Sequence, residues 1–401
     1  MQTASLDHHR NWRALASLAV LSSIALGASL VDADSQGASE YISAARSAIL
    51  IDAQSGATLF AKNADEPLPP ASLSKLMTMA VAFKALKEKR FTRESEFKMS
   101  EHAWRTGGAP SRTAAMFVPL NSKVSLGDLI QGVIVQSGND AAIAIAEGLA
   151  GSEAAFAREM QTEARRIGLT TTTFVNATGL DDPSQKMSSR DLGRLTLHLI
   201  KEYPEYYKWF AQREFSYRKH RFFNRNPLLA EDLGVDGLKT GHTDASGYGI
   251  AASANRDGRR LVAVVMGLQS ATRRKVEVKK LLDWGFRRAT EATIFTAGET
   301  IGYARVWAGT SFYVPMTTPT DAVVTLIRGT PDRELSGEIV YDWPLKPPIR
   351  KGDEVAKLRL STPYGLKQEF TLVADQNIDS SGLAWRGADA LALLVWRKLG
   401  F

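Results

Sequence analysis

The chain has 401 residues, of which 23 % are charged and 44 % hydrophobic, a composition typical of two or three soluble globular domains. It excludes a collagen-like, disordered or polytopic membrane protein. The net charge of +7 favours an anionic partner such as a lipid surface, a cell-wall polymer or nucleic acid, but no zinc-finger spacing or aromatic-rich RNA motif supports nucleic acid. The absence of cysteine excludes disulfides, thiol chemistry and a lipid-modified N-terminal cysteine, and it is compatible with export.

Residues 1–40 are predicted to be a signal peptide and N-terminal segment. Arg10 and Arg13 precede an uncharged apolar run over residues 14–31, and small residues that suit a signal peptidase occur near positions 28–38. We expect cleavage, although a run of this length could also remain as a transmembrane anchor.

The next predicted elements are a β-hairpin over residues 48–60 and a helix over residues 72–89, which follows two prolines. Residues three apart share a helix face, so Ser72 and Lys75 are predicted to lie side by side. A serine hydroxyl is a weak nucleophile until a base takes its proton, and a neutral lysine amine one turn away can be that base. On its own, a Ser-x-x-Lys pair is more often part of an exposed helix face.

Two further motifs follow. Ser137 and Asn139 lie where a predicted helix ends and the next begins, a context in which Ser and Asn usually cap a helix. Lys239, Thr240 and Gly241 occur in a run that reads as a strand, where Lys-Thr-Gly is usually part of a turn. Sheet strands are predicted over residues 235–243, 247–253 and 260–267, with a helix over residues 275–289.

The C-terminal part differs in kind. Residues 291–381 contain short strands between turns and are predicted to form a small all-β domain. Residues 382–401 have apolar side chains at helical spacing together with Arg386, Arg397 and Lys398, which predicts an amphipathic helix. That helix is too short and too charged to span a bilayer, but it could lie in the surface of an anionic membrane. The alternative is a helix that packs on its own β domain.

The three motifs occur in the order found in serine acyltransferases that act on penicillin and peptidoglycan. The chain resembles the D-alanyl-D-alanine carboxypeptidases of peptidase family S11, low-molecular-mass penicillin-binding proteins of the 5/6 type. The resemblance is close over residues 45–290, whereas the β domain and the tail match the family in layout. The stretches that carry it are residues 51–56, 70–78, 137–141, 178–181, 188–192, 224–226, 235–244 and 279–286.

The resemblance implies an α/β fold: a β-lactamase/transpeptidase-like domain with an antiparallel sheet flanked by helices, then a small all-β domain and a terminal amphipathic helix. We therefore expect a signal segment (residues 1–40), a catalytic domain (41–290), a β domain (291–381) and a membrane-associating helix (382–401). The expected reaction needs no metal and no cofactor.

The resemblance also implies a mechanism. Ser72 would attack the carbonyl between the two terminal D-alanines of a peptidoglycan stem peptide, and water would then release the shortened peptide. Lys75 would be the base, with its pKa lowered by burial and by Lys239. Ser137 would relay a proton to the leaving amine, and Asn139 would hold Lys75 and the substrate.

Substrate binding is expected to use the strand that carries Lys-Thr-Gly. Lys239, Thr240 and Gly241, with Arg225 or Arg274, would receive the substrate carboxylate. By family analogy the backbone N–H groups of Ser72 and His242 would stabilise the oxyanion. The His242 side chain is expected to be positional rather than an acid or base, and the neighbours Arg190 and Asp191 to form a structural ion pair.

The expected partners are a stem peptide ending in D-Ala-D-Ala, β-lactam antibiotics, and an anionic inner-membrane surface through the terminal helix. The protein would be exported to the periplasm and be peripheral on the outer face of the cytoplasmic membrane.

Three alternative functions stay open. A β-lactamase is disfavoured because no glutamate between Ser137 and Lys239 precedes Leu-Asn. A D,D-endopeptidase is disfavoured because such relatives commonly lack the β domain. A catalytically silent cell-wall scaffold is disfavoured because it would not need all the reactive residues that are present here.

Overall fold

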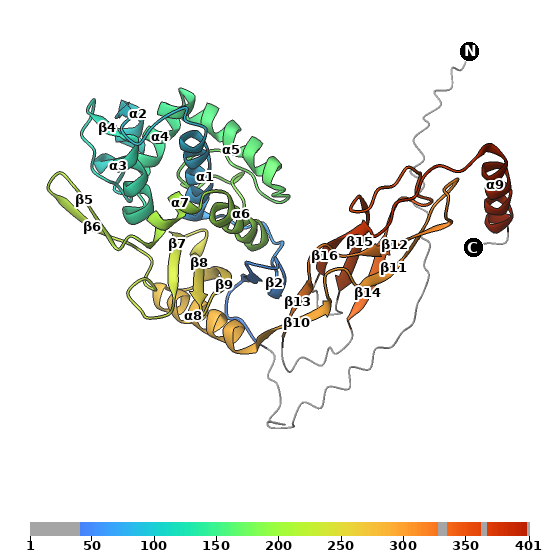
Figure 1. Ribbon diagram of the computed structural model, residues 1–401. Coiled ribbons are helices and arrows are strands. Elements are labelled where there is room, and N and C mark those ends of the chain that lie inside the picture. The colour runs from blue at the N-terminus through green and yellow to red at the C-terminus, as the bar shows by residue number, and fades with distance from the viewer. Residues whose placement is uncertain (1–40, 328–334, 362–366, 399–401) are drawn as a thin grey trace, which may run out of the picture. The chain divides into compact units, whose positions relative to one another are not determined.

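The computed structural model describes residues 41–327, 335–361 and 367–398, so the predicted signal segment lies outside the described residues. The described chain divides into a larger unit that ends at Thr290 and a smaller unit that begins at Glu291. Each unit has its own sheet and its own core (Figure 1).

The larger unit is built on a five-stranded antiparallel sheet with the strand order β2-β1-β9-β8-β7. The inner strands are long runs of Val, Ile and Ala. Helices cover both faces of the sheet, so side chains that point to either face are buried and can be apolar. The three strands predicted from residue 235 onward are confirmed. The bounds are β1 Ser47–Asp52, β2 Thr58–Lys62, β7 Val235–Thr243, β8 Gly247–Arg256 and β9 Arg259–Leu268.

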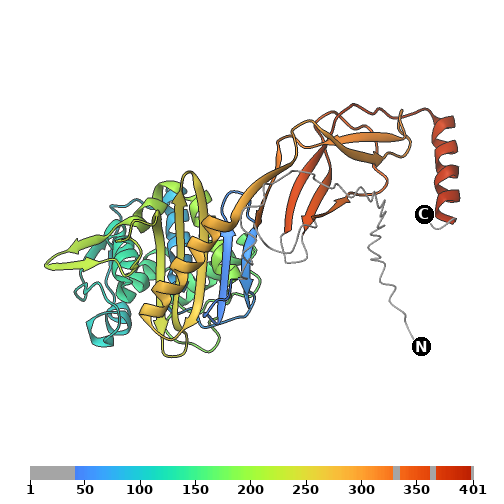
Figure 2. The ribbon, with the colours of Figure 1, turned by 90° about the horizontal axis from the view of Figure 1, so that it is seen from below.

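Helices cover both faces of this sheet (Figures 1 and 2). Gly285 of α8 (Ala271–Arg288) packs against Leu50, while Gly193 of α6 (Ser189–Glu202) packs against Ile51. Successive side chains of a strand point to opposite faces, so α8 and α6 lie on opposite sides of β1. The predicted helix-flanked antiparallel sheet is therefore confirmed.

A helical layer with α1 (Lys75–Lys87) at its centre completes the larger unit. Eleven of the thirteen residues of α1 are buried, because neighbouring helices surround it. The other elements of this layer are η1 Ala71–Ser74, α2 Glu101–Gly107, η2 Ala109–Ser111, α3 Leu126–Gln131, η3 Gly132–Gln136, α4 Asn139–Ala150, α5 Glu153–Ile167, α7 Pro204–Tyr207 and η4 Lys208–Ala211. Two small hairpins pair β3 (Glu96–Lys98) with β4 (Lys123–Ser125), and β5 (Glu214–Tyr217) with β6 (His220–Phe223).

The smaller unit is all-β apart from its terminal helix. Its five-stranded sheet has the order β11-β12-β16-β15-β14, and β10 pairs with β13 beside it. Buried and exposed residues alternate along β15, as expected for a sheet with one face in a core. The bounds are β10 Ala289–Phe295, β11 Thr300–Arg305, β12 Tyr313–Thr317, β13 Ala322–Ile327, β14 Ser336–Val340, β15 Glu354–Ser361 and β16 Lys367–Ala374.

The terminal helix α9 (Leu383–Lys398) is fixed to this β unit near its start. Asp389 is 3 % exposed; its carboxylate pairs with Arg305 and accepts a hydrogen bond from the Ala308 amide at 2.8 Å. The ring of Trp385 lies 5.4 Å from that of Phe312. Packing on the β domain, left open by the sequence, is thus observed at this end of α9, while Leu383 and half of Trp385 stay exposed. None of the described helices is long and apolar enough to cross a membrane.

Candidate active site

Ser72 and Lys75 are in direct contact. Ser72 lies in the 3-10 helix η1, and α1 begins only at Lys75, so the prediction of a continuous α-helix from Ser72 is wrong in this detail. A 3-10 helix has three residues per turn, which eclipses side chains three apart. The Lys75 Nζ lies 3.0 Å from the Ser72 Oγ.

Besides the Ser72 hydroxyl, the Lys75 amine has two hydrogen-bond partners among the described residues, and both are oxygen acceptors. Lys75 Nζ donates to Asn139 Oδ1 at 2.6 Å and to the backbone oxygen of Thr178. A neutral amine has two N–H donors and one lone pair. The two oxygens take both donors, so the lone pair faces the Ser72 hydroxyl, which is the arrangement that lets the amine take its proton.

Burial supports the neutral form of Lys75. Its side chain is fully buried, and this desolvation, assisted by the charge of Arg225, lowers the pKa of Lys75 from its ordinary 10.5 to about 7. A base with a pKa near neutrality is half-deprotonated at working pH, which suits it for general base catalysis.

The Ser-x-Asn motif turns the chain between η3 and α4. Ser137 adopts a left-handed backbone with φ of 64°, and its buried hydroxyl has no hydrogen-bond partner among the described residues. Such an unpaired hydroxyl is costly unless a ligand completes it. Asn139 is oriented by its Nδ2, which donates to Thr113 Oγ1 at 2.8 Å and so directs its oxygen at Lys75.

The segment around Thr178 is part of the site, a role that sequence reasoning missed. Asn176 Oδ1 accepts the amides of Thr178 and Gly179 and turns the chain so that the Thr178 oxygen reaches Lys75. Gly179 has a φ of +79°, and a Cβ there would meet the backbone oxygen of Ala71 at 1.8 Å. Only glycine fits this turn against η1. The glycine after Thr178 was therefore the sequence feature that could have indicated that this segment approaches the site.

Glu153 supports that segment from behind. Its Oε1 accepts the Ala177 amide at 3.0 Å, and the Ala177 oxygen accepts the Thr78 hydroxyl at 2.7 Å. These bonds fix the residue just before Thr178, so Glu153 helps to hold the oxygen that binds Lys75. Its negative charge also raises the pKa of Lys75, against the larger effect of burial.

The edge strand β7 forms the facing wall. A Cβ on Gly241 would lie 2.9 Å from the Pro70 oxygen and 3.0 Å from the Leu73 side chain, so this glycine lets β7 approach η1 closely. Lys239 and Thr240 are buried next to it. His242 is exposed, and its ring stacks on Tyr248 with centroids 3.8 Å apart.

Three further cations converge here. Burial first, and then the charges of Lys75, Arg225 and Arg274, lower the pKa of Lys239 well below its ordinary value. Desolvation also lowers the pKa values of both arginines. Arg274 packs over the Tyr248 ring and is 8 % exposed. Among the described residues, no carboxylate pairs with Lys239, Arg225 or Arg274, so the cluster is suited to receive an anion.

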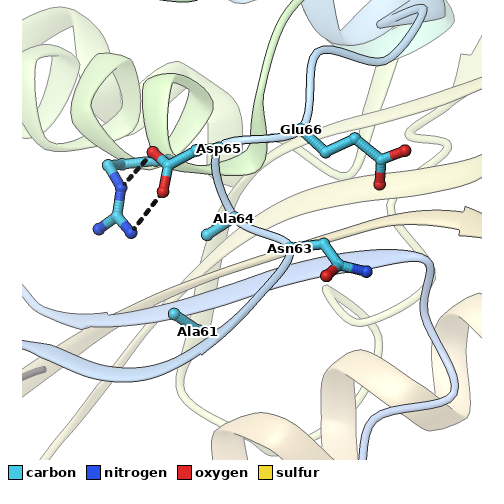
Figure 3. A pocket seen from close by; sticks show the side chains of 6 residues that line it. Ala61, Asn63, Ala64, Asp65 and Glu66 are labelled. Carbon is cyan, nitrogen blue, oxygen red and sulfur yellow. Dashed lines mark hydrogen bonds and ion pairs between the residues drawn. The ribbon is translucent and has the colours of Figure 1, made fainter. Parts of the chain in front are cut away.

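Arg190 and Asp191 do not pair with each other, which corrects the expectation from the sequence. Arg190 pairs with Asp65 in a surface hollow lined also by Ala61, Asn63, Ala64 and Glu66 (Figure 3). Asp191 is buried and accepts bonds from residues 170–172 instead, because the two side chains leave α6 in different directions. This hollow contains none of the predicted site residues.

Across the described ranges there is no group of His, Cys, Asp or Glu suited to a metal ion.

Family models match both parts of the chain. Residues 34–270 match the D-alanyl-D-alanine carboxypeptidase family, peptidase S11, and residues 290–380 match the C-terminal domain of penicillin-binding protein 5. The D-alanyl-D-alanine carboxypeptidase DacC of Escherichia coli is 37 % identical over 358 residues, which cover 89 % of this chain and 90 % of that protein. DacA of Haemophilus influenzae is 38 % identical over 78 % of this chain and 80 % of its own.

Solved structures give the same result. Penicillin-binding protein 5 from Haemophilus influenzae matches with a TM-score of 0.74 and 35 % identity, over 86 % of this chain and all of that one. Penicillin-binding protein D2 from Listeria monocytogenes, solved with ampicillin bound, matches 62 % of this chain and all of its own with a TM-score of 0.56 and 30 % identity. The chain belongs to the peptidase S11 family of D-alanyl-D-alanine carboxypeptidases.

Proposed function

We propose that the protein removes the terminal D-alanine from peptidoglycan stem peptides through an acyl-enzyme on Ser72. The observation that carries this proposal is the buried Lys75 amine, whose two donors are taken by Asn139 and Thr178 while its third direction faces the Ser72 hydroxyl at 3.0 Å. A nucleophile with a base at hydrogen-bond distance, itself oriented by other groups, is the arrangement of covalent acyl transfer.

In the first half-reaction the Ser72 oxygen bonds to the carbonyl carbon between the two D-alanines, and its proton passes to Lys75. The peptide C–N bond then breaks, and Lys75 passes that proton through Ser137 to the departing D-alanine amine; the Ser137 hydroxyl is buried and unpaired among the described residues. In the second half-reaction water attacks the ester carbonyl carbon and gives a proton to Lys75. The ester C–O bond then breaks, and Lys75 returns this proton to the Ser72 oxygen. The net change is peptide plus water giving a shortened peptide plus D-alanine.

Binding is proposed to use the cation cluster on the β7 side. The substrate ends in a carboxylate, and Lys239 and the Thr240 hydroxyl, with Arg225 or Arg274, offer it donors. No carboxylate in the described part of the chain pairs with these three cations. The oxyanion would accept the N–H of Ser72 and an N–H of β7 at His242. The free edge of β7 beside η1 supports this assignment because backbone donors of an edge strand stay available to a ligand. The same site would bind β-lactams covalently.

The test is D-alanine release from a diacetyl-Lys-D-Ala-D-Ala peptide, with and without penicillin, together with labelling by a fluorescent penicillin. The wild type should release D-alanine, penicillin should block it, and the label should persist for many minutes. Ser72→Ala should neither release D-alanine nor take the label while its circular dichroism stays unchanged. A Ser72→Ala protein that still labelled covalently would falsify the assignment, and rapid loss of the label from the wild type would indicate a β-lactamase.

We further propose an exported, periplasmic protein held at the outer face of the cytoplasmic membrane through α9. The exposed Leu383 and Trp385, followed in sequence by Arg386, Arg397 and Lys398, support binding to an anionic surface. The variant Leu383→Glu/Trp385→Glu should lose most sedimentation with phosphatidylglycerol vesicles and keep full activity on the soluble peptide. Unchanged sedimentation would refute this role for α9.

A further inference from the structure

The hairpin of β5 and β6 projects from the larger unit and contacts η3 (Figures 1 and 2). Residues 213–225 include five Lys or Arg residues and a histidine but one acid, Glu214. Glu214 pairs with Arg221, so it neutralises none of the other cations. Arg218 and Lys219 form the exposed tip, and neither makes an ion pair with any described residue. The hairpin therefore presents uncompensated positive charge to solvent.

Aromatic rings accompany these charges. Phe223 is 62 % exposed, and Phe117 from the neighbouring loop is 41 % exposed. The Phe117 ring lies over His220 and Phe222, with centroids 5.2 Å and 6.4 Å away. Exposed aromatic rings among cations are unusual on a free surface and typical of surfaces that bind a partner.

Both sides of this surface connect to the active site. Phe117 has a left-handed backbone with φ of 60°, and the amides of its neighbours Met116 and Val118 donate to Asp140, the residue after Asn139. On the other side, Arg225 follows β6 by two residues and belongs to the cation cluster around Lys239. A long substrate that ends at Ser72 thus has a basic and aromatic surface available beyond the site.

We propose that this hairpin surface binds the carboxylates of further stem peptides on polymeric peptidoglycan and so favours the polymer over short peptides. The proposal rests on the proposed function for the identity of the polymer. Charge complementarity supports this occupant, since each stem peptide carries free carboxylates, and the Arg225 end of the hairpin lies where the substrate carboxylate is received. Long-range attraction of this kind acts mainly on affinity and association rate.

The test is co-sedimentation of the full chain with purified insoluble peptidoglycan. Arg218→Glu/Lys219→Glu reverses the two charges at the tip. Lys280→Glu/Arg287→Glu on α8 is the matched control, since it changes the net charge equally at two exposed residues that form no ion pair with any described residue. At about 50 mM salt the hairpin variant should bind about tenfold more weakly than wild type and the control within about twofold, a difference that 0.5 M salt should abolish.

Hydrolysis adds a second measurement. The hairpin variant should release D-alanine from the short peptide within about twofold of wild type, which also shows that it is folded, and release from the polymer should fall about tenfold. Equal binding of the hairpin and control variants to peptidoglycan would overturn the proposal. Absence of D-alanine release by the wild type would overturn the proposed function instead, and the sedimentation experiment would still decide whether the hairpin binds the polymer.

Discussion

The two units each bury a cation, and they do so in opposite ways. In the β unit, Arg305 is largely covered, with 12 % of its side chain exposed, and pairs with the buried carboxylate of Asp389, which also accepts a hydrogen bond from the Ala308 amide. In the catalytic unit, Lys75 is buried against neutral oxygens of Asn139 and Thr178 and against the Ser72 hydroxyl. The carboxylate of Asp389 compensates the charge of Arg305, whereas burial lowers the pKa of Lys75 and favours its neutral form.

This difference separates a structural group from a chemical one. The ion pair between Asp389 and Arg305 holds the start of α9 against the β unit. Its charged groups are occupied by each other, so they are not available to exchange a proton with a substrate. A buried amine such as Lys75, which contacts no carboxylate directly among the described residues, can keep a lone pair and a pKa near neutrality, so it can exchange a proton with its neighbour. Four experiments test this distinction between the two cations.

The largest effect is expected from Lys75→Arg. A guanidinium keeps the positive charge but cannot lose its proton in a protein, so it cannot act as the base. Acylation by fluorescent penicillin should slow by about 10³-fold or more. A rate within tenfold of wild type would show that the neutral amine is not required.

In the β unit, Asp389→Asn should leave Arg305 buried without its counter-charge. Breaking one partner of a buried pair costs about 3–5 kcal/mol, so the amides near the start of α9 should exchange hydrogen correspondingly faster. Activity on a soluble peptide should not change. Asp379→Asn, which breaks the exposed pair with Arg350, is the control and should cost at most about 1 kcal/mol. Equal protection in both variants would contradict the structural role of Asp389.

The third experiment is the pH dependence of the wild type. The base must be neutral, and the pKa of Lys75 is lowered to about 7, so the neutral fraction falls as the pH drops below that value. The kcat/KM for the short peptide should therefore fall about tenfold per pH unit below 7, to about one hundredth at pH 5. A flat profile between pH 5 and 7 would exclude Lys75 as the titrating base.

The smallest effect is expected from Glu153→Gln. Glutamine can still accept the Ala177 amide, but it lacks the negative charge that raises the pKa of Lys75. The acidic limb of the pH profile should shift to lower pH by less than about one unit, with little change in the maximal rate. Glu153→Ala, which also loses the hydrogen bond, should reduce the maximal rate about tenfold. A shift toward higher pH would contradict the assigned effect of the charge.

Much of the fold followed from the sequence because its signals are local. Apolar runs between glycine turns predicted the strands of the catalytic sheet, and the change to short strands at residue 291 predicted an all-β C-terminal domain. The motif order identified the chemistry, since Ser72 and Lys75 are three residues apart and any helical turn brings them together. The boundary between η1 and α1 could not be predicted, because it depends on close packing of β7 and Gly179 against η1.

The sequence was enough to assign the family and to predict Ser72 as nucleophile and Lys75 as its base, because both depend on residue types at short, fixed spacing. The groups that surround Lys75 became visible only in the folded chain. The Thr178 oxygen and Glu153 behind it come from segments far from Lys75 in the chain, and Arg190 pairs with the distant Asp65 rather than with its neighbour. Only the folded arrangement shows that no carboxylate among the described residues pairs with Lys239. The lowered pKa of Lys75 is likewise a property of burial, which arises only when the helical layer and the sheet close around it.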